Sequence, residues 1–522
     1  MIKQTKVENG WLRGIPGADP RVYCYKGVPF AAPPVGDLRW HSPMPAEDWV
    51  GVRDCARFAP ISMQATPGAQ NNVYSREWNV DLEIEMDEDC LYLNVWTPAS
   101  DDTERLPVFV WFFGGGLQEG NTQEMEFNGE RLARKGIVVV TVNYRVNCFG
   151  FLCHPDITAE NPDAPANFGY LDQFAGMKWV KRNIAAFGGD PDNITIGGQS
   201  AGGGSVVSHL TTPVTEGLFH KAIIMSGTFF GGYAPLNVGG GPGKNFKELP
   251  EAEELGVAFF EHLGVKTLKE ARELDKFYIR DKYAEFIGGV FDTTALRTRG
   301  ISSTRMGAVV DYKYLFGTGT VRAVENQRHM LPLLMGNTAI EFPNVPPYSS
   351  NEELMEYARS AFGDRADEFL KTVLCDNWED TKKKATTSTV ELGCRCICES
   401  TSRLKDAPSV YYYVTDQEMP GWDNMGAFHS SDLWFFFDTL AVCWRPFVGK
   451  DYDLARMMST YWANFMKTGD PNGTDADGTP LPEWKSYQQS RSPMYFRDHP
   501  QMKDESFESD VMKFLVDFHT NK

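Results

Sequence analysis

A serine in a glycine-rich turn is the strongest candidate for chemistry in this sequence. The segment Gly198-Gln199-Ser200-Ala201-Gly202 fits the pattern G-x-S-x-G of the nucleophile elbow, a sharp turn that exposes a serine oxygen. The β-branched and small residues before it, ITIGGQ, predict a short buried strand, and the apolar residues after it, SVVSHL, predict a helix. The serine would then lie beside backbone N–H groups at the positive end of a helix. This placement predicts that Ser200 is a nucleophile.

A serine nucleophile needs a base that accepts its proton and a carboxylate that orients the base. In folds with a nucleophile elbow these residues follow in the order serine, acid, histidine, each after a strand. The order favours His429, which follows the predicted strand 408–416 through a polar, glycine-containing loop. His499 is the rival, because a short extended run precedes it in MYFRDHP. Six other histidines are less suited to be the base, because of their place in the chain order or their helical setting: His41, His154, His209, His220, His262 and His329.

Glu341 is the preferred candidate for the acid. It follows the predicted strand 331–338 directly, in the segment GNTAIEF, and lies between the elbow and His429 in the chain. An acidic residue just past a strand is usually a solvated loop residue, so its place in the chain order is what favours a functional role. Asp311 is the alternative, although no comparably clear strand precedes it in AVVDYKYLF.

The negative oxygen that forms when a serine attacks an ester must be met by preorganised backbone N–H groups. The segment Phe113-Gly114-Gly115-Gly116 ends an early predicted strand, where glycines can turn backbone donors towards one point. Together with the N–H of Ala201, these glycines would form an oxyanion hole with three donors. Three glycines at a strand end are also typical of a simple loop, and the motif alone would favour that interpretation.

The elements that must position these residues alternate between strand and helix, which indicates an α/β fold. Continuous apolar runs predict strands buried on both faces of a parallel sheet, at 90–98, 106–113, 137–144, 220–227, 331–338 and 408–416. Residues 173–187 have helical periodicity, and the stretches 249–300 and 351–405 are expected to be mainly helical. The first 60 residues suggest a small antiparallel start, and the glycine-rich segment 231–245 is expected to be a surface loop near the site.

Composition narrows the possible partners. The net charge of −19 argues against a nucleic-acid partner, which needs a basic face. No apolar run approaches the roughly 18–20 residues of a membrane span. The first residues, MIKQTKVENGWLRG, lack the apolar segment of a secretory signal.

Ten cysteines are scattered along the chain. The clustered Cys394, Cys396 and Cys398 would not share one helix face, which disfavours a metal site there. Reduced thiols in the cytoplasm are therefore expected.

Ordered stretches over nearly the whole chain resemble one known family. They include YKGVPFAAPPVGDLRW, EDCLYLNVW, VFVWFFGGG, NYRVNCFGFL, NFGYLDQFAGMKWVKRNIAAFGGDP, ITIGGQSAGG, MSG, GNTAIE, GAFH and YWANFMKTGDPNG. By these motifs the sequence is similar to the type-B carboxylesterase/lipase family, which includes the cholinesterases. The resemblance implies one α/β-hydrolase domain over residues 1–522, with a mostly parallel central sheet covered by helices and with large helical insertions.

The resemblance also implies the site and the reaction. It assigns Ser200 as nucleophile, Glu341 as acid and His429 as base, Gly115, Gly116 and Ala201 as oxyanion donors, and Ser226 as a buried support of the triad. The expected function is hydrolysis of small-molecule carboxylic esters through an acyl-enzyme, without a metal or an organic cofactor. The expected substrates are short- to medium-chain acyl esters or aryl esters. The alternatives are a lipase, a cinnamoyl or acetyl esterase, or a non-catalytic binding protein on the same fold; the sequence does not give the oligomeric state.

Three departures from the family pattern bear on these expectations. Ser62 stands where many secreted relatives carry the disulfide partner of the cysteine at Cys90, which agrees with a protein that is not secreted. Gln199 replaces a glutamate of the cholinesterases, which makes choline esters less suitable as predicted substrates. Phe113 and Phe342 replace a histidine and a glycine and are expected to change the shape of the pocket. Other aromatic residues that could line a pocket are more often core: Trp111, Phe229, Phe230 and Trp434 to Phe437.

Overall fold

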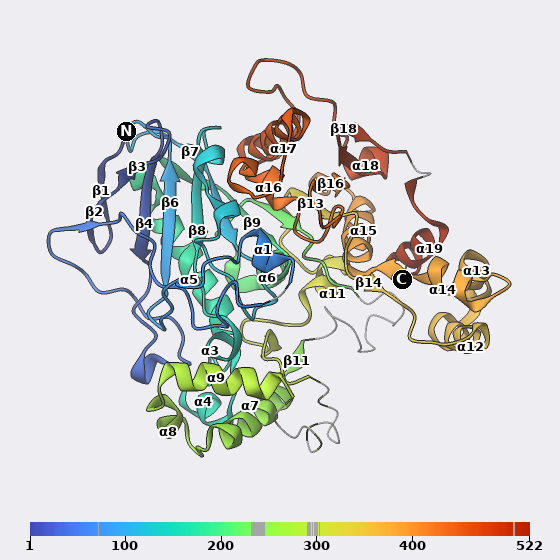
Figure 1. Cartoon of the computed structure of the whole chain (residues 1–522), viewed down its shortest axis with the longest axis horizontal. Helices are drawn as coiled ribbons and strands as arrows, with labels where there is room; N and C mark the ends of the chain where they lie inside the picture. The colour runs from blue at the N-terminus through green and yellow to red at the C-terminus, as the bar shows by residue number, and fades with distance from the viewer. Residues whose placement is uncertain are drawn as a thin grey trace.

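A sheet of eleven strands forms the centre of the part of the chain described by this computed structural model (Figure 1). The structure describes residues 1–70, 72–230, 246–289, 294, 296, 301, 303–504 and 507–521. The glycine-rich segment 231–245, expected to be a surface loop, lies outside these residues. In spatial order the strands are β18 (His499–Met502), β17 (Met494–Arg497), β16 (Val410–Thr415), β13 (Leu333–Thr338), β10 (Lys221–Met225), β9 (Gly189–Gln199), β7 (Leu106–Phe112), β8 (Val138–Val142), β6 (Tyr92–Thr97), β4 (Tyr23–Pro29) and β3 (Ile15–Pro16).

The middle of this sheet is parallel and its two edges are antiparallel. Every neighbouring pair from β17 through β16, β13, β10, β9 and β7 to β8 is parallel. Strand β18 pairs antiparallel at one edge, and β6, β4 and β3 continue antiparallel at the other. The predicted mostly parallel central sheet is therefore confirmed. A separate small sheet near the N-terminus contains β1 (Gln4–Val7), β2 (Gly10–Arg13) and β5 (Val52–Asp54).

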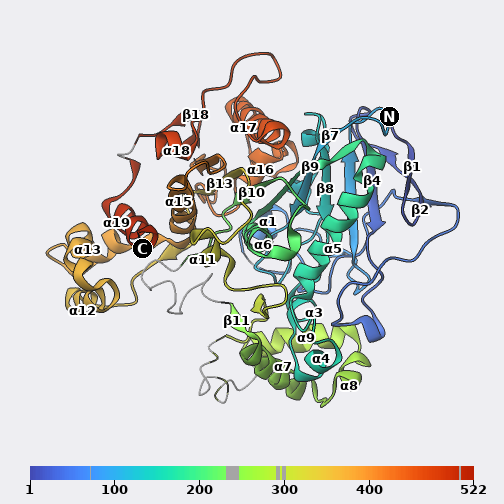
Figure 2. The same ribbon diagram turned by 180° about the vertical axis from the view of Figure 1, so that it is seen from behind.

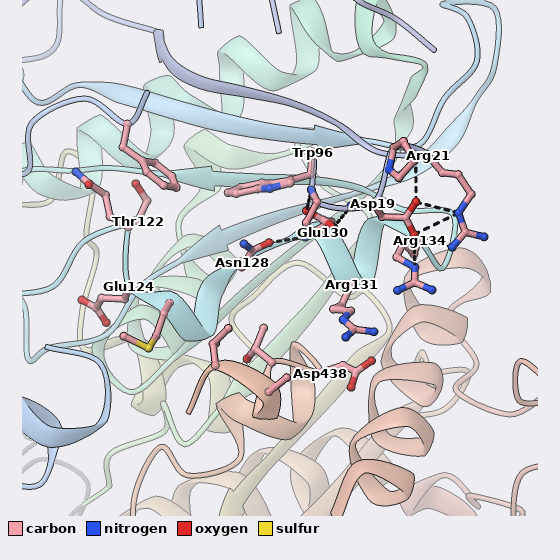
Figure 3. Close-up of a pocket in the computed structure, with 18 residues that line it drawn as sticks. Asp19, Arg21, Trp96, Thr122, Glu124, Asn128, Glu130, Arg131, Arg134 and Asp438 are labelled. Carbon is pink, nitrogen blue, oxygen red and sulfur yellow. Dashed lines mark hydrogen bonds and ion pairs between the residues drawn. The ribbon is translucent and has the colours of Figure 1, made fainter. Parts of the chain in front are cut away.

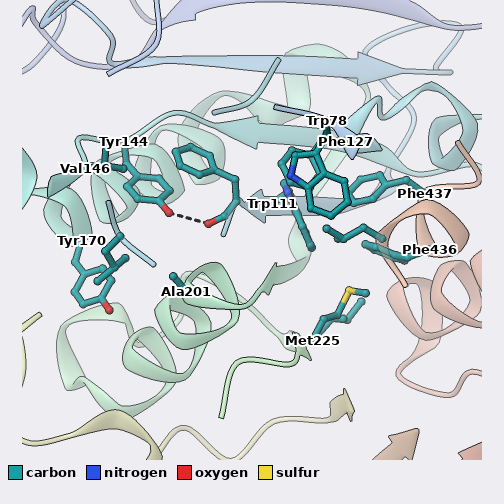
Figure 4. Packing of buried hydrophobic residues seen from close by; sticks show 14 of the residues in the cluster. Trp78, Trp111, Phe127, Tyr144, Val146, Tyr170, Ala201, Met225, Phe436 and Phe437 are labelled. Atoms are coloured by element: carbon teal, nitrogen blue, oxygen red, sulfur yellow. Dashed lines mark hydrogen bonds between the residues drawn. The ribbon is translucent and has the colours of Figure 1, made fainter. Parts of the chain in front are cut away.

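Helices cover both faces of the sheet, which explains why its strands read as unbroken apolar runs. Alternate residues of one strand point to opposite faces. In β7, Phe109 and Trp111 join a core with α16 (Leu433–Phe436) and α17 (Gly449–Thr468). Val108 and Val110 join a second core with α5 (Phe168–Asn183), α6 (Ala201–Thr211) and α15 (Thr389–Ser402). Figure 2 shows α5 lying along the strands, and Figure 4 shows Trp111 beside aromatic residues of the first core.

Two further groups of helices lie away from the sheet, as the predicted insertions require. The first contains α7 (Leu249–Leu263), α8 (Leu268–Arg272) and α9 (Lys276–Ile287), at the bottom of Figure 1. The second contains α12 (Asn351–Phe362), α13 (Ala366–Val373) and α14 (Trp378–Ala385), near α19 (Asp510–Thr520). Among all the described residues, no helix is both long enough and apolar enough to span a membrane.

A buried ion-pair network attaches the short helix α1 (Tyr74–Glu77) to the C-terminal part of the chain. Arg445 donates to Glu77 through Nε at 2.9 Å and Nη2 at 2.6 Å, and to both oxygens of Asp423 at 2.8 Å. The indole N–H groups of Trp434 and Trp444 also donate to Glu77, each at 3.2 Å. Because the side chains of Arg445 and Glu77 are fully buried, each depends on the other for compensation of its charge.

Replacing Arg445 by methionine should therefore be strongly destabilising, since Glu77 would be left fully buried without its cation. We expect Arg445→Met to lower the free energy of unfolding by about 3–5 kcal/mol in a urea titration. The control is Arg13→Met, which breaks an ion pair with Asp54 between side chains that are 51% and 65% exposed, and should cost less than about 1 kcal/mol. Equal losses in the two variants would contradict this role for Arg445.

Candidate active site

Ser200 stands in a strained turn between β9 and α6. Its backbone has φ 55° and ψ −123°, a conformation that non-glycine residues rarely adopt. Crowding around the turn explains the glycines on both sides. A Cβ at Gly198 would collide with the carbonyl of Gly202, and one at Gly202 would collide with the carbonyl of Phe112. The strand and the helix can therefore approach closely, and the turn between them holds the hydroxyl of Ser200 clear of the sheet.

Ser200, His429 and Glu341 form one continuous chain of hydrogen bonds. The hydroxyl of Ser200 lies 2.8 Å from Nε2 of His429, and Nδ1 of His429 lies 2.5 Å from Oε2 of Glu341. A carboxylate can only accept, so Nδ1 carries the proton and Nε2 is free to accept from the serine. The side chains of His429 and Glu341 are 7% and 1% exposed, so water competes little for these bonds.

Glu341 is fixed by donors from two neighbouring strands. Its Oε1 accepts from the backbone N–H of Thr338 at 3.0 Å and from the hydroxyl of Thr338 at 2.9 Å. The hydroxyl of Ser226, just after β10, donates to the same oxygen at 2.6 Å. Three donors hold one carboxylate oxygen and leave the other directed at His429. Ser226, the serine of the motif MSG, therefore contacts Glu341 directly.

The glycines after β7 lie against the serine turn. A Cβ at Gly114 would be 3.2 Å from Cβ of Ser200, and Gly115 and Gly116 have φ of 95° and 65°, which favour glycine. Within the described chain, the N–H groups of Gly115 and Gly116 donate to no protein acceptor. The N–H of Ala201, the first residue of α6, has no acceptor inside its own helix. These groups are free to meet an anion beside Ser200.

The start of this glycine segment is held rigidly by Tyr144. The rings of Tyr144 and Phe113 are stacked with centroids 4.1 Å apart, and the hydroxyl of Tyr144 donates to the carbonyl of Phe113 at 2.7 Å (Figure 4). Both side chains are buried. Phe113 thus contributes to the core under the glycines rather than to the pocket wall, which differs from the expectation that it shapes the pocket.

Ser200 and His429 open into a cavity of about 410 Å³, a size that suits a small ligand. Phe342, the residue after the acid, lies with its ring centroid 4.5 Å from that of His429, and Phe229 lies 6.2 Å from Phe342. The other lining residues are Tyr74, Trp78, Asn79, Gly114, Gly115, Gly116, Glu119, Gly120, Glu124, Phe127, Gln199, Arg305, Ser430 and Leu433. Aromatic rings therefore share the wall with polar and charged side chains.

The sequence distinguishes only some of the aromatic residues that line the cavity from those that lie in the core. Of the aromatic residues considered at the outset, Phe229 lines the cavity, whereas Trp111, Phe230 and Trp434 to Phe437 are buried and absent from its lining. Tyr74 and Trp78, which come from α1 and its C-terminal end, also line the cavity and were not predicted from the sequence. No local signal marks them, because their segment reads as a polar loop and only long-range packing brings them to the cavity.

The rival candidates lie elsewhere. Asp311 follows a two-residue strand, β12 (Val309–Val310), and accepts from Nδ2 of Asn167 at 2.9 Å and from three consecutive backbone N–H groups. It therefore orders a loop. His499 is an exposed residue of the edge strand β18. Neither residue lines the cavity around Ser200.

Two of the family departures have a clear structural setting. All ten cysteines are unpaired, and burial together with nearby charges raises the pKa of the Cys90 thiol, which is hydrogen-bonded to Ser62. Gln199 places its side-chain nitrogen 3.3 Å from Nε2 of His429. A neutral amide therefore lies beside the imidazole of His429. The thiols of Cys394, Cys396 and Cys398 are buried in α15, and no group of three or more metal-ligating side chains occurs among the described residues.

A larger cavity, of about 840 Å³, is lined in part by the segment 122–125 (Figure 3). Trp96 and Phe58 line it together with Arg21, Arg131 and Arg134, but none of its lining residues is a serine, cysteine or histidine. Glu124 lines both cavities. Burial raises the pKa of Glu124 to about 7, and burial beside Glu124 raises the pKa of Glu126 well above its ordinary value. The larger cavity therefore lacks a serine and a histidine like those that line the smaller one.

Comparisons with known proteins give the family and the fold. The model of the carboxylesterase family matches residues 2–515. Fumonisin B1 esterase of Sphingopyxis macrogoltabida is 31% identical over 490 residues, which cover 90% of this chain and 83% of that protein. Cholinesterase of Mus musculus is 28% identical over 531 residues, which cover 92% of this chain and 81% of that protein. The structure of a thermophilic PNB esterase superposes with a TM-score of 0.73 at 26% identity, covering 98% of this chain and 100% of that one. The chain belongs to the carboxylesterase family, and it is a carboxylic-ester hydrolase with the α/β-hydrolase fold.

Proposed function

We propose that the protein hydrolyses small-molecule carboxylic esters through an acyl-enzyme, with Ser200 as nucleophile, His429 as base and Glu341 as acid. The observation that carries the proposal is the continuous chain of hydrogen bonds from Ser200 through His429 to Glu341 at 2.8 and 2.5 Å. This is the arrangement by which a serine loses its proton while it attacks and by which the resulting imidazolium is stabilised.

In acylation, the hydroxyl oxygen of Ser200 bonds to the ester carbonyl carbon while its proton passes to Nε2 of His429. The π-electron pair of the carbonyl moves to oxygen, and the N–H groups of Gly115, Gly116 and Ala201 donate to that oxyanion. When the intermediate collapses, the bond to the alcohol oxygen breaks and His429 returns the proton to the leaving alcohol. Glu341 holds the imidazole in the required tautomer throughout.

Deacylation repeats these steps with water in place of the serine. His429 accepts a proton from the water, the hydroxide oxygen bonds to the acyl carbon, and the oxyanion forms at the same donors. Collapse then breaks the bond to Ser200, which recovers its proton from His429 and releases the carboxylic acid. The proton transfer between Ser200 and His429 joins atoms that are 2.8 Å apart. No metal or organic cofactor is part of the proposal.

The cavity supports a preference for short- to medium-chain acyl or aryl esters. Phe342 and Phe229 crowd the space beside His429, while the cavity of about 410 Å³ leaves room for a small ring or chain. A long acyl chain would need those rings to move. The aromatic residues of the wall suit apolar substituents on the ester.

The remaining proposals concern the chain as a whole. We propose that residues 1–522 form a single domain, which is supported by the family match over 2–515 and by a central sheet with strands from Ile15 to Met502. A cytoplasmic location is supported by the ten unpaired cysteines. A nucleic-acid partner is not expected for a chain with a net charge of −19.

The first test is hydrolysis of 4-nitrophenyl esters from acetate to long acyl chains. We expect turnover of the short esters, and we expect Ser200→Ala and His429→Ala each to lower kcat on the order of 10⁴-fold or more. Ser100→Ala and His499→Ala change exposed residues of the same types and should keep full activity. Turnover that survives in Ser200→Ala, or that depends on His499, would refute the proposed roles.

The second test concerns Phe342, whose ring lies against His429 and is 44% exposed. Phe342→Gly should enlarge the acyl side of the cavity and raise kcat/KM for a bulky or branched acyl ester by about tenfold relative to acetate. Phe342→Leu keeps most of the volume and should leave the ratio nearly unchanged. The ratio of the two kcat/KM values is the measurement, and an unchanged ratio in Phe342→Gly would place the acyl group elsewhere.

A further inference from the structure

The cavity around Ser200 shares part of its wall with a second, polar cavity. This second cavity has a volume of about 300 Å³, and Gly115, Glu119 and Arg305 line both cavities. Four other residues that line the second cavity carry side-chain amides: Gln64, Gln70, Gln118 and Asn147. An ester bound at Ser200 therefore has polar surroundings for a substituent that extends past Gly115 towards Arg305.

Arg305 is the cation of this shared wall. Among the described residues, no other lysine or arginine lines the cavity around Ser200. The hydrogen bonds of Arg305 are made by its backbone: its carbonyl accepts from Nζ of Lys247 at 3.4 Å, and its N–H donates to the hydroxyl of Ser303 at 3.3 Å. Its guanidinium has no acceptor and no ion-pair partner in the part of the chain that the structure describes. All five N–H donors of this permanently charged group are therefore available to a ligand.

The backbone next to Arg305 is attached to the glycine segment of the site. The N–H of Met306 donates to the hydroxyl oxygen of Tyr283 at 2.9 Å, and that hydroxyl donates to Oε1 of Gln118 at 2.8 Å. Nε2 of Gln118 donates back to the carbonyl of Met306 at 2.7 Å, and its backbone N–H donates to the carbonyl of Gly115 at 3.0 Å. Met306 and Tyr283 are buried. Arg305 therefore has a fixed place relative to Gly115.

Two carboxyl groups of the same wall limit the charge that a ligand can carry. Glu119 accepts from Nε2 of Gln70 at 2.6 Å, and burial raises its pKa while Gln70 and Arg305 oppose the rise. Glu124 accepts from the N–H of Asn121 at 2.9 Å, and burial raises its pKa to about 7. Beside these acids, in a chain with a net charge of −19, a single negative charge is favoured over a dianion such as phosphate.

We propose that Arg305 is a specificity-determining residue, which binds a carboxylate carried by the ester substrate. The substrates would then be esters with a free carboxylate on their acyl or their alcohol part. The guanidinium fork matches a carboxylate with two parallel hydrogen bonds, which gives both charge and geometric selectivity. The inference rests on the proposed function, because the ester must be bound at Ser200. Arg305 takes no part in the proton transfers.

Two matched pairs of esters test this role. One pair is the mono-4-nitrophenyl ester of adipic acid and its primary amide, and the other is 4-acetoxybenzoate and 4-acetoxybenzamide. Within each pair the shape is kept and the negative charge is removed. The measurement is the ratio of kcat/KM for the carboxylate to kcat/KM for the amide. We expect a ratio above one for the wild type in at least one pair.

The variants of Arg305 separate its charge from its shape. Arg305→Gln removes the charge and should lower the ratio about tenfold in the pair that the wild type discriminates. Arg305→Lys keeps the charge without the planar fork and should give an intermediate ratio. Arg105→Gln is the control, because Arg105 is an exposed residue just before β7, whereas the glycines follow the other end of that strand. It removes the same charge and should leave the ratio at its wild-type value.

Three outcomes would overturn the inference. They are a wild type that favours the amide in both pairs, a ratio that Arg305→Gln does not change, and an equal fall of the ratio in Arg105→Gln, which would indicate an effect of net charge alone. Failure of the proposed function would look different, because the wild type would then hydrolyse neither member of either pair.

Discussion

The strained turn at Ser200 is the constraint on which the rest of the site depends. A serine with φ 55° and ψ −123° stores backbone strain, and only close packing of the strand before it against the helix after it can maintain that conformation. The glycines at 198 and 202 make this packing possible, because a side chain at either position would collide with the neighbouring backbone. The consequence is an exposed hydroxyl beside N–H groups that have no acceptor of their own, in a site that needs both.

The parallel sheet solves the second problem, which is to bring together residues that are far apart in the sequence. Ser200 follows β9, Ser226 follows β10, Glu341 follows β13 and His429 follows β16, and these four strands are consecutive neighbours in the sheet. Since the carboxyl ends of parallel strands meet at one edge, residues 229 positions apart come within a hydrogen bond of each other. The loop lengths can vary widely without disturbing this edge, which leaves the two groups of inserted helices free to grow outside it.

Much of this framework could be predicted because it is encoded locally. The strands are continuous apolar runs, the serine turn has glycines at fixed spacing, and the chain order of acid and histidine narrows the remaining candidates to Glu341 and His429. The cavity wall could not be predicted in the same way. Tyr74 and Trp78 come from a segment that reads as a polar loop, and they reach the cavity only because Glu77 is bound by Arg445, 368 residues away. The cluster at Trp434 to Phe437 resembles a pocket lining in composition, yet it packs into the core under the sheet.

The central claim, that Ser200 is the nucleophile of an acyl-enzyme, is tested most directly by trapping the covalent intermediate. A 4-nitrophenyl dialkylcarbamate would transfer a carbamoyl group that deacylates slowly, so that the labelled enzyme accumulates and can be digested and mapped by mass spectrometry. The account predicts release of about one 4-nitrophenolate per protein molecule and a carbamoyl group on Ser200, with no labelling in His429→Ala at the same pH. A label on another residue, or ester turnover by an enzyme that never becomes labelled, would contradict it.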